Sequence, residues 1–202
     1  MKEWDEYLDD SKQRWEENAN FWDNYMGEES NAFHREIIRP DTEKLLNICE
    51  NETILDIACG NGNFSKRMVE LGAKVVAFDY SSTMIERARA RCSDYLDKID
   101  FMVLDATDYK ALFSLGKNRF DKAVANMALM DIATIKPLLK AVNYLLKSKG
   151  VFVFSLMHPC FQPPGLTRVY EEKDNDGEII AQRSIKISRY IKPETFKGVA
   201  VK

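Results

Sequence analysis

The sequence predicts an α/β fold built on a doubly wound, mostly parallel β-sheet. Five short apolar runs alternate with amphipathic helical segments between residues 53 and 157. Strands that are covered on both faces have continuous apolar runs, and intervening helices make the connections of a parallel sheet. A chain of 202 residues with 45% hydrophobic side chains can bury the core that this fold requires.

The first 50 residues are predicted to be helical. Between Trp4 and about Glu50, large apolar side chains recur among Glu, Lys and Asn, as is typical of amphipathic helices. Pro40 is expected to break this region in two. A second helix is then expected to begin at Asp41, because aspartate is a favourable N-cap residue.

The expected sheet strands are residues 53–58, 74–79, 99–105, 121–127 and 151–157. The helices that should connect them are residues 63–72, 82–92, 107–116 and 134–150. Gly72 and Gly150 are expected to end the first and last of these helices, since glycine is favoured at helix C-caps. Thr83 and Glu86 have the spacing of a capping box at the start of the second helix.

The pattern becomes irregular after Pro159. Residues 161–165 (FQPPG) form a cluster of helix and strand breakers, and residues 173–178 (KDNDGE) predict a turn. We therefore expect a hairpin from about Thr167 to Ile191. Residues 163–202 are interpreted as an irregular or hairpin extension that is an incomplete C-terminal part of the same domain.

Charge and composition narrow the class of function. The formal net charge of −3 provides no basic field for nucleic acid and favours a small-molecule substrate. No apolar run is long enough to span a bilayer, and the first twenty residues are too polar for a signal peptide, which predicts a cytoplasmic protein. The cysteines lack the spacing of a zinc site or a disulfide scaffold, so we expect no metal and mostly buried, reduced thiols at Cys49, Cys59, Cys92 and Cys160.

A glycine turn follows the first expected strand and opens a helix, in residues 54–65 (ILDIACGNGNFS). Gly60 and Gly62 can let the backbone approach a ligand, although such a pair also occurs where a chain merely turns tightly. Asp79 ends the second strand, seventeen residues beyond Gly62, where doubly wound folds place a carboxylate that binds a ribose. The alternative for Asp79 is that it caps the next helix.

Motifs at four successive strand ends resemble those of class I S-adenosylmethionine-dependent methyltransferases, whose core is Rossmann-like. The resemblance covers about residues 15–162. The chain has Ala58 where that family usually has its first glycine, and it has Asn63-Phe64 beyond the last one. The matching motifs are Asp56 before the glycines, Asp79-Tyr80-Ser81, Leu104-Asp105-Ala106, and Phe120-Asp121 leading to Asn126-Met127-Ala128.

A nicotinamide-dependent enzyme with the same topology is the first alternative. Its fingerprint would have a third glycine near Ser65 and no acid inside the first strand. Ser65 and Asp56 therefore both disfavour this alternative.

The resemblance implies that the first and fourth motifs bind the methionine part of S-adenosylmethionine. Asp56 would orient the ammonium group, and its structural alternative is a partner in a helix cap. The turn and the end of the fourth strand would approach the amino-acid moiety through the backbone of Ala58, Cys59, Gly60, Gly62, Asn126, Met127 and Ala128. For Met127, an ordinary strand position remains an alternative.

The second and third motifs are implied to bind the adenosine. Asp79 would accept the ribose hydroxyls, Asp105 would accept the adenine amino group, and the Ala106 N–H would meet the ring. Tyr80 would lie against the adenine but could instead belong to the core, and Asp105 could be a solvated turn acid. Met84 would pack nearby, Thr107 would border the pocket, and Ser81 would bind the cofactor as part of the Asp79-Tyr80-Ser81 motif.

Methyl transfer from a sulfonium depends mainly on positioning, and it needs a base only when the acceptor must lose a proton early. His158 follows the fifth strand and is the candidate base. Its alternative is to anchor the turn at Pro159. No Asn-Pro-Pro-Tyr motif follows the fourth strand, which argues against methylation of a nucleobase amino group.

Residues 1–50 resemble the helical lid of such enzymes, over a cofactor-binding core at residues 51–162. Trp15 and Trp22 would wall the substrate cavity, and Arg35 would pair with the cofactor carboxylate; the alternative is a helix packed on the sheet with solvated charges. The family's sheet has two further strands, for which residues 163–202 are too few. A protein that binds the cofactor without catalysis is therefore the second alternative, and an open edge at the fifth strand favours a homodimer.

Overall fold

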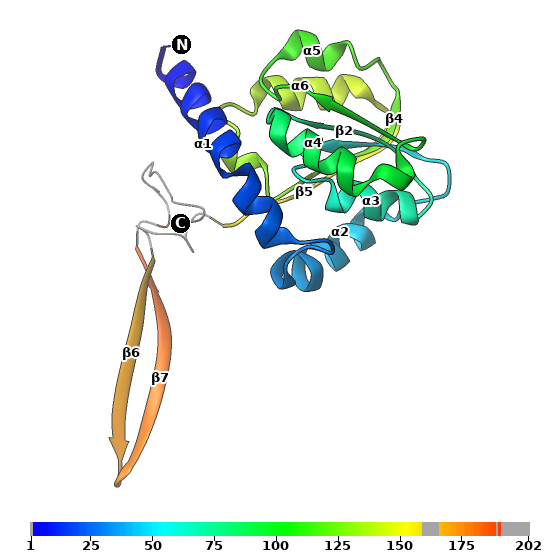
Figure 1. Cartoon of the computed structure of the whole chain (residues 1–202). Helices are drawn as coiled ribbons and strands as arrows, with labels where there is room; N and C mark the ends of the chain where they lie inside the picture. The colour runs from blue at the N-terminus through cyan, green and yellow to red at the C-terminus, as the bar shows by residue number, and fades with distance from the viewer. Residues whose placement is uncertain (1, 159–165, 189, 191–202) are drawn as a thin grey trace. The chain divides into compact units, whose positions relative to one another are not determined.

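The computed structural model describes residues 2–158, 166–188 and 190 (Figure 1). The chain forms two compact units, Met1–Leu156 and Met157–Lys202. The first unit contains a five-stranded parallel sheet in the order β3-β2-β1-β4-β5, which confirms the predicted fold class. Its strands are β1 Thr53–Ile57, β2 Lys74–Asp79, β3 Ile99–Val103, β4 Phe120–Asn126 and β5 Leu146–Ser155.

Helices cover both faces of this sheet because its side chains alternate between two buried clusters. Leu55 faces the cluster that includes Leu138 from α6, whereas Ile54 faces the cluster that includes Met68 from α3 and Ile85 from α4. No described helix is both long and apolar enough to cross a bilayer. The α-helices are α1 Lys2–Met26, α2 Arg39–Leu46, α3 Asn63–Glu70, α4 Ser82–Arg91, α5 Tyr109–Phe113 and α6 Lys136–Leu145.

The N-terminal region is helical as predicted, but the expected break at Pro40 is wrong. The interruption lies after Met26, where Gly27 has a φ of 63°. A π-helix, His34–Ile38, runs directly into α2, and Pro40 lies in the first turn of α2, where its fixed φ is compatible with the helix. The N-cap is Ile38, so Asp41 is inside the helix rather than at its start.

Two other expected helix boundaries are also wrong. Ser81 is the N-cap of α4, and its side chain accepts a hydrogen bond from the Met84 N–H. Helix α6 ends at Leu145, and Gly150 lies within β5. A Cβ at Gly150 would be 2.9 Å from the Lys147 carbonyl oxygen, so glycine is needed there for a close approach of two backbone segments at an irregularity in the β4–β5 pairing.

The second unit contains the predicted hairpin, formed by β6 Leu166–Asn175 and β7 Glu178–Ile187. Asp176 and Gly177 connect the strands, and both have positive φ, at 55° and 88°. Two such residues are the preferred turn of a tight hairpin. Cys160, the breaker cluster and the expected hairpin end at Ile191 lie outside the described residues.

Candidate functional site

The candidate site lies where the carboxyl ends of β1 and β2 meet. Asp56 and Ile57 pair with Ala77 and Phe78 of the neighbouring parallel strand. The Cys59 N–H donates to the Phe78 carbonyl at 3.0 Å, which holds the glycine turn against the end of β2. In open α/β sheets this edge, beside the point where the strand order reverses, is where ligands bind.

Asp79 fixes the glycine turn through hydrogen bonds to backbone N–H groups. Its Oδ2 accepts from Gly60 N and its Oδ1 accepts from Ser81 N, both at 3.0 Å. Only 7% of Asp79 is exposed, and burial raises its carboxyl pKa to about 6. Since a carboxylate has about four acceptor positions, these two bonds leave capacity for ligand hydroxyls.

Asp56 is a buried acid that has no cationic partner among its hydrogen bonds in the described structure. Its Oδ2 accepts from the Ser65 hydroxyl at 2.5 Å, and the residue is 3% exposed. Burial, reinforced by the charge of Asp79, raises the pKa of Asp56 to about 7 despite the Ser65 hydrogen bond. Strongly perturbed acids of this kind concentrate at functional sites.

The two glycines of the turn serve different purposes. Gly60 has a φ of 54°, and a Cβ built there meets no atom within 4 Å, so the backbone is open to a ligand. Gly62 has a φ of 79°, and its Cβ would be 2.9 Å from the Ala88 Cβ of α4. The expected ligand approach therefore fits Gly60, while Gly62 is needed for packing. Ala58 also takes a left-handed conformation, with a φ of 52°, which is strained for a residue with a Cβ.

The residues after β2 and β3 also form defined structures. Asp105 Oδ1 accepts from the Thr107 N–H at 2.7 Å and from its hydroxyl at 2.8 Å, which orders the loop around the buried Ala106. The Tyr80 hydroxyl donates to the Ser11 carbonyl of α1 at 2.9 Å. Ser81 and Met84 are buried at the start of α4. Their roles toward a ligand remain predictions.

The end of β4 is joined to α2 and β5. Asn126 Oδ1 accepts from the Thr42 hydroxyl at 3.0 Å and from the Ser155 hydroxyl at 3.2 Å. Met127 has a φ of 51°, and its N–H donates to Ser155. Ala128 is buried behind this bend. The chain therefore bends at residues 126–128, the fourth motif, at the same edge of the sheet where Asp56 lies.

The candidate lid residues have other contacts. Trp15 and Trp22 meet edge to face, with ring centroids 5.4 Å apart. Arg35 donates to the Ser30 carbonyl and pairs with Glu36, both in its own segment rather than in the glycine turn. His158 belongs to the second unit, where its ring stacks on Tyr190 at 5.8 Å. The roles proposed for these residues also remain predictions.

Sequence reasoning missed the polar contacts between α1 and α4. Glu16 Oε1 accepts from the hydroxyls of Ser82 and Thr83 and from the Thr83 N–H. Although burial acts to raise the pKa of Glu16, hydrogen bonds at the start of α4 lower it to about 2.

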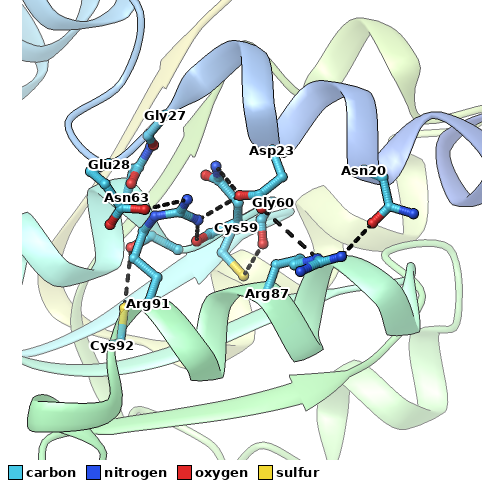
Figure 2. A network of polar contacts seen from close by, with 12 residues as sticks. Asn20, Asp23, Gly27, Glu28, Cys59, Gly60, Asn63, Arg87, Arg91 and Cys92 are labelled. Carbon is cyan, nitrogen blue, oxygen red and sulfur yellow. Dashed lines mark hydrogen bonds and ion pairs between the residues drawn. The ribbon is translucent and has the colours of Figure 1, made fainter.

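Near the other end of α1, Asp23 lies between Arg87 and Arg91 (Figure 2). The helical spacing of these polar residues was a signal, but it did not identify their partners.

His34 is a second feature that sequence reasoning did not assign. Its Nδ1 donates to Asn31 Oδ1 at 3.0 Å, so the neutral ring presents Nε2 as an acceptor. Burial lowers the pKa of His34, and its ring lies edge to face with Trp22 at 6.1 Å. Both side chains are partly buried in the N-terminal segment.

Comparisons with known proteins agree with this geometry. Residues 48–189 match a family described as a methyltransferase domain. The ubiquinone biosynthesis O-methyltransferase of Bartonella quintana is 34% identical over 124 residues, which are 61% of this chain and 48% of that protein. The demethylmenaquinone methyltransferase of Clavibacter sepedonicus is 32% identical over 102 residues, which are 50% and 40% of the two chains.

A solved structure supports the same family. The S-adenosylmethionine-dependent methyltransferase of Mesorhizobium loti superposes with a TM-score of 0.62 at 28% identity, over 80% of this chain and 66% of that one. The matches to the two curated relatives each span less than half of the relative's length.

Proposed function

The chain belongs to the methyltransferase-domain family, one of the class I S-adenosylmethionine-dependent methyltransferases, and from that premise we propose that it methylates a small-molecule acceptor. The observation that carries this proposal is the pair of buried acids, Asp56 and Asp79, beside the open backbone of Gly60. The nicotinamide alternative is disfavoured by the family match together with Asp56 and Ser65.

Each acid has a role in the proposed binding mode that suits its surroundings. Asp56 is buried with only a hydroxyl as donor, so a ligand ammonium group would supply the positive charge that its ionised form needs. Asp79 is held in place by Gly60 and Ser81 and would accept the two ribose hydroxyls. Asp105 would accept the adenine amino group from the ordered loop after β3.

The proposed chemistry needs few groups from the protein. S-adenosylmethionine, when bound, supplies an electrophilic methyl group, and the chain has to align the acceptor and exclude water. Helix α1 would contribute to this enclosure with Trp15 and Trp22, and Arg35 would bind the cofactor carboxylate after a rearrangement of its segment. His158 would take a proton from acceptors that must lose one.

Small-molecule acceptors are favoured by the charge of −3 and by the names of the relatives. A cytoplasmic location is proposed on the sequence alone. A homodimer is proposed because the outer edge of β5 pairs with no other described strand, and Val151 and Phe154 of this strand are exposed apolar side chains. Light scattering would test the dimer, and a strictly monomeric chain would contradict it.

Thermal shift and titration with S-adenosylhomocysteine, NAD and NADP test the cofactor. A ligand at a hundred times its dissociation constant adds about 2.7 kcal/mol of stability, so S-adenosylhomocysteine alone should raise the Tm clearly. Stabilisation by NAD instead would refute the proposal. A methyl-transfer assay over a panel of small acceptors then distinguishes an active enzyme from a protein that binds the cofactor without turnover.

A further inference from the structure

Three residues from three different elements meet beside the glycine turn. Asp23 Oδ1, on α1, accepts from Arg91 Nη1 at 2.7 Å and from Asn61 Nδ2 at 3.0 Å. Arg91 Nη1, at the end of α4, also donates to the Asn61 backbone carbonyl at 3.0 Å. Helix α1 thus holds the side chain of Asn61, and helix α4 holds its backbone carbonyl. Figure 2 shows Asp23 and Arg91 facing each other beside Gly60.

These contacts are shielded from solvent. The side chain of Arg91 is 6% exposed, that of Asp23 is 14% exposed, and Asn61 is buried. Buried charges are weakly screened. Removal of one partner leaves the other with only a longer ion pair, Arg91 with Glu28 at 3.4 Å or Asp23 with Arg87. The contact is therefore a firm attachment of α1, unlike the pair between Arg87 and Asp23, whose atoms are 3.9 Å apart and whose arginine is 51% exposed.

Asn61 is also the residue whose position sets the shape of the turn. It lies between Gly60 and Gly62, which both have positive φ and can adopt many other conformations. The Gly60 N–H must point at Asp79 Oδ2 for the observed hydrogen bond. Holding Asn61 by both its backbone and its side chain therefore restricts the part of the turn that is open to a ligand.

We propose that Asp23 and Arg91 are positioning residues that couple the docking of α1 to the cofactor-binding conformation of the glycine turn. They act through Asn61 and do not touch the cofactor. The inference rests on the proposed function, since it takes this turn to be part of the S-adenosylmethionine site. By thermodynamic reciprocity, a docked α1 strengthens cofactor binding and a bound cofactor stabilises the docked α1 by the same factor.

Titration calorimetry with S-adenosylhomocysteine tests the coupling. Asp23→Ala and Arg91→Ala should each weaken binding by about tenfold, within the usual range of such couplings. The double variant should lose less than the sum of the two single losses, because Asp23 and Arg91 share one ion pair and both hold Asn61. The KM for S-adenosylmethionine should rise by a similar factor, with kcat kept at saturating cofactor.

Arg87→Ala is the matched control. It removes an arginine that links α1 to α4 through Asn20 and Asp23 without touching Asn61. Its affinity for S-adenosylhomocysteine should stay within about twofold of the wild type. An equal loss in Arg87→Ala and Arg91→Ala would show a general effect of helix docking and would overturn the proposed route through Asn61.

Hydrogen exchange makes the test independent of the cofactor. In the ligand-free chain, Asp23→Ala should speed amide exchange in residues 58–62 as well as in α1, whereas Arg87→Ala should affect α1 alone. Asp23→Asn, which removes the charge but keeps an acceptor for Asn61, provides a milder variant if Asp23→Ala does not fold. Unchanged exchange in the turn of the folded variants would overturn the coupling. Absence of S-adenosylhomocysteine binding by the wild type would instead refute the proposed function.

Discussion

Replacement of Asp56 by asparagine is expected to stabilise the ligand-free chain at neutral pH. The unfolded carboxyl has a pKa of 3.8, and burial raises it to about 7 in the folded chain. The folded chain therefore keeps its proton to a higher pH, so stability falls as the pH rises from about 4 to about 7 and then levels off. A difference of about three pKa units corresponds to a contribution of about 4 kcal/mol.

Asparagine cannot ionise, but it keeps an oxygen that accepts from Ser65. The free energy of unfolding of Asp56→Asn should therefore exceed that of the wild type by up to about 4 kcal/mol at pH 8, with the difference shrinking toward pH 4. Asp79 titrates in both proteins, so the difference contains the contribution of Asp56 together with its interaction with Asp79. Urea denaturation of the two proteins across this pH range measures it. If the free energies of unfolding of the two proteins changed with pH in the same way, ionised Asp56 would not destabilise the folded chain.

Three further predictions concern the other site residues. Asp79→Ala removes a carboxylate whose charged hydrogen bonds contribute about 1.5 to 3 kcal/mol each, so calorimetry should show at least about a hundredfold loss of S-adenosylhomocysteine affinity; wild-type affinity would remove Asp79 from the site. Asp105→Ala should weaken binding of S-adenosylhomocysteine more than binding of an analogue without the adenine amino group, and equal losses would contradict the contact. Ala58→Gly should raise the free energy of unfolding by about 0.5 to 1 kcal/mol, because relief of about 1 to 2 kcal/mol of left-handed strain exceeds the entropy that glycine adds to the unfolded chain. A lower Tm would show that the packing of the alanine methyl group stabilises the folded chain.

The parts of the fold that follow from hydrophobic pattern were predictable from the sequence. The five parallel strands were found because each contains an apolar run, whereas the polar start of β5, residues 146–150, was predicted to be helical. Asp56 and Asp79 stood out because acids are rare inside or directly after such runs. The topology then places both acids at one edge of the sheet, so a linear pattern was enough to bring together residues 23 positions apart.

The parts that depend on tertiary contact were not predictable. Ser81 and Thr83 are both good N-cap residues, and only the backbone of the folded chain selects Ser81. Gly150 matched a helix C-cap because left-handed turns and close backbone approaches both require glycine. Asp23 has its partner 68 residues away, and nothing in the local pattern distinguishes it from other acids on α1.

The buried acids and the attachment of α1 are two aspects of one arrangement. In the ligand-free chain, burial disfavours the charged forms of Asp56 and Asp79. The glycines between these acids would make the turn flexible, but Arg91 restrains it through the backbone of Asn61. A ligand that brings an ammonium group and two hydroxyls would satisfy both acids at once. Since Gly60 joins Asp79 to the same turn that Asp23 and Arg91 hold, binding there would also strengthen the attachment of α1. Through the proposed coupling, helix α1 would respond to a bound cofactor by way of Asn61, as a lid over this site requires.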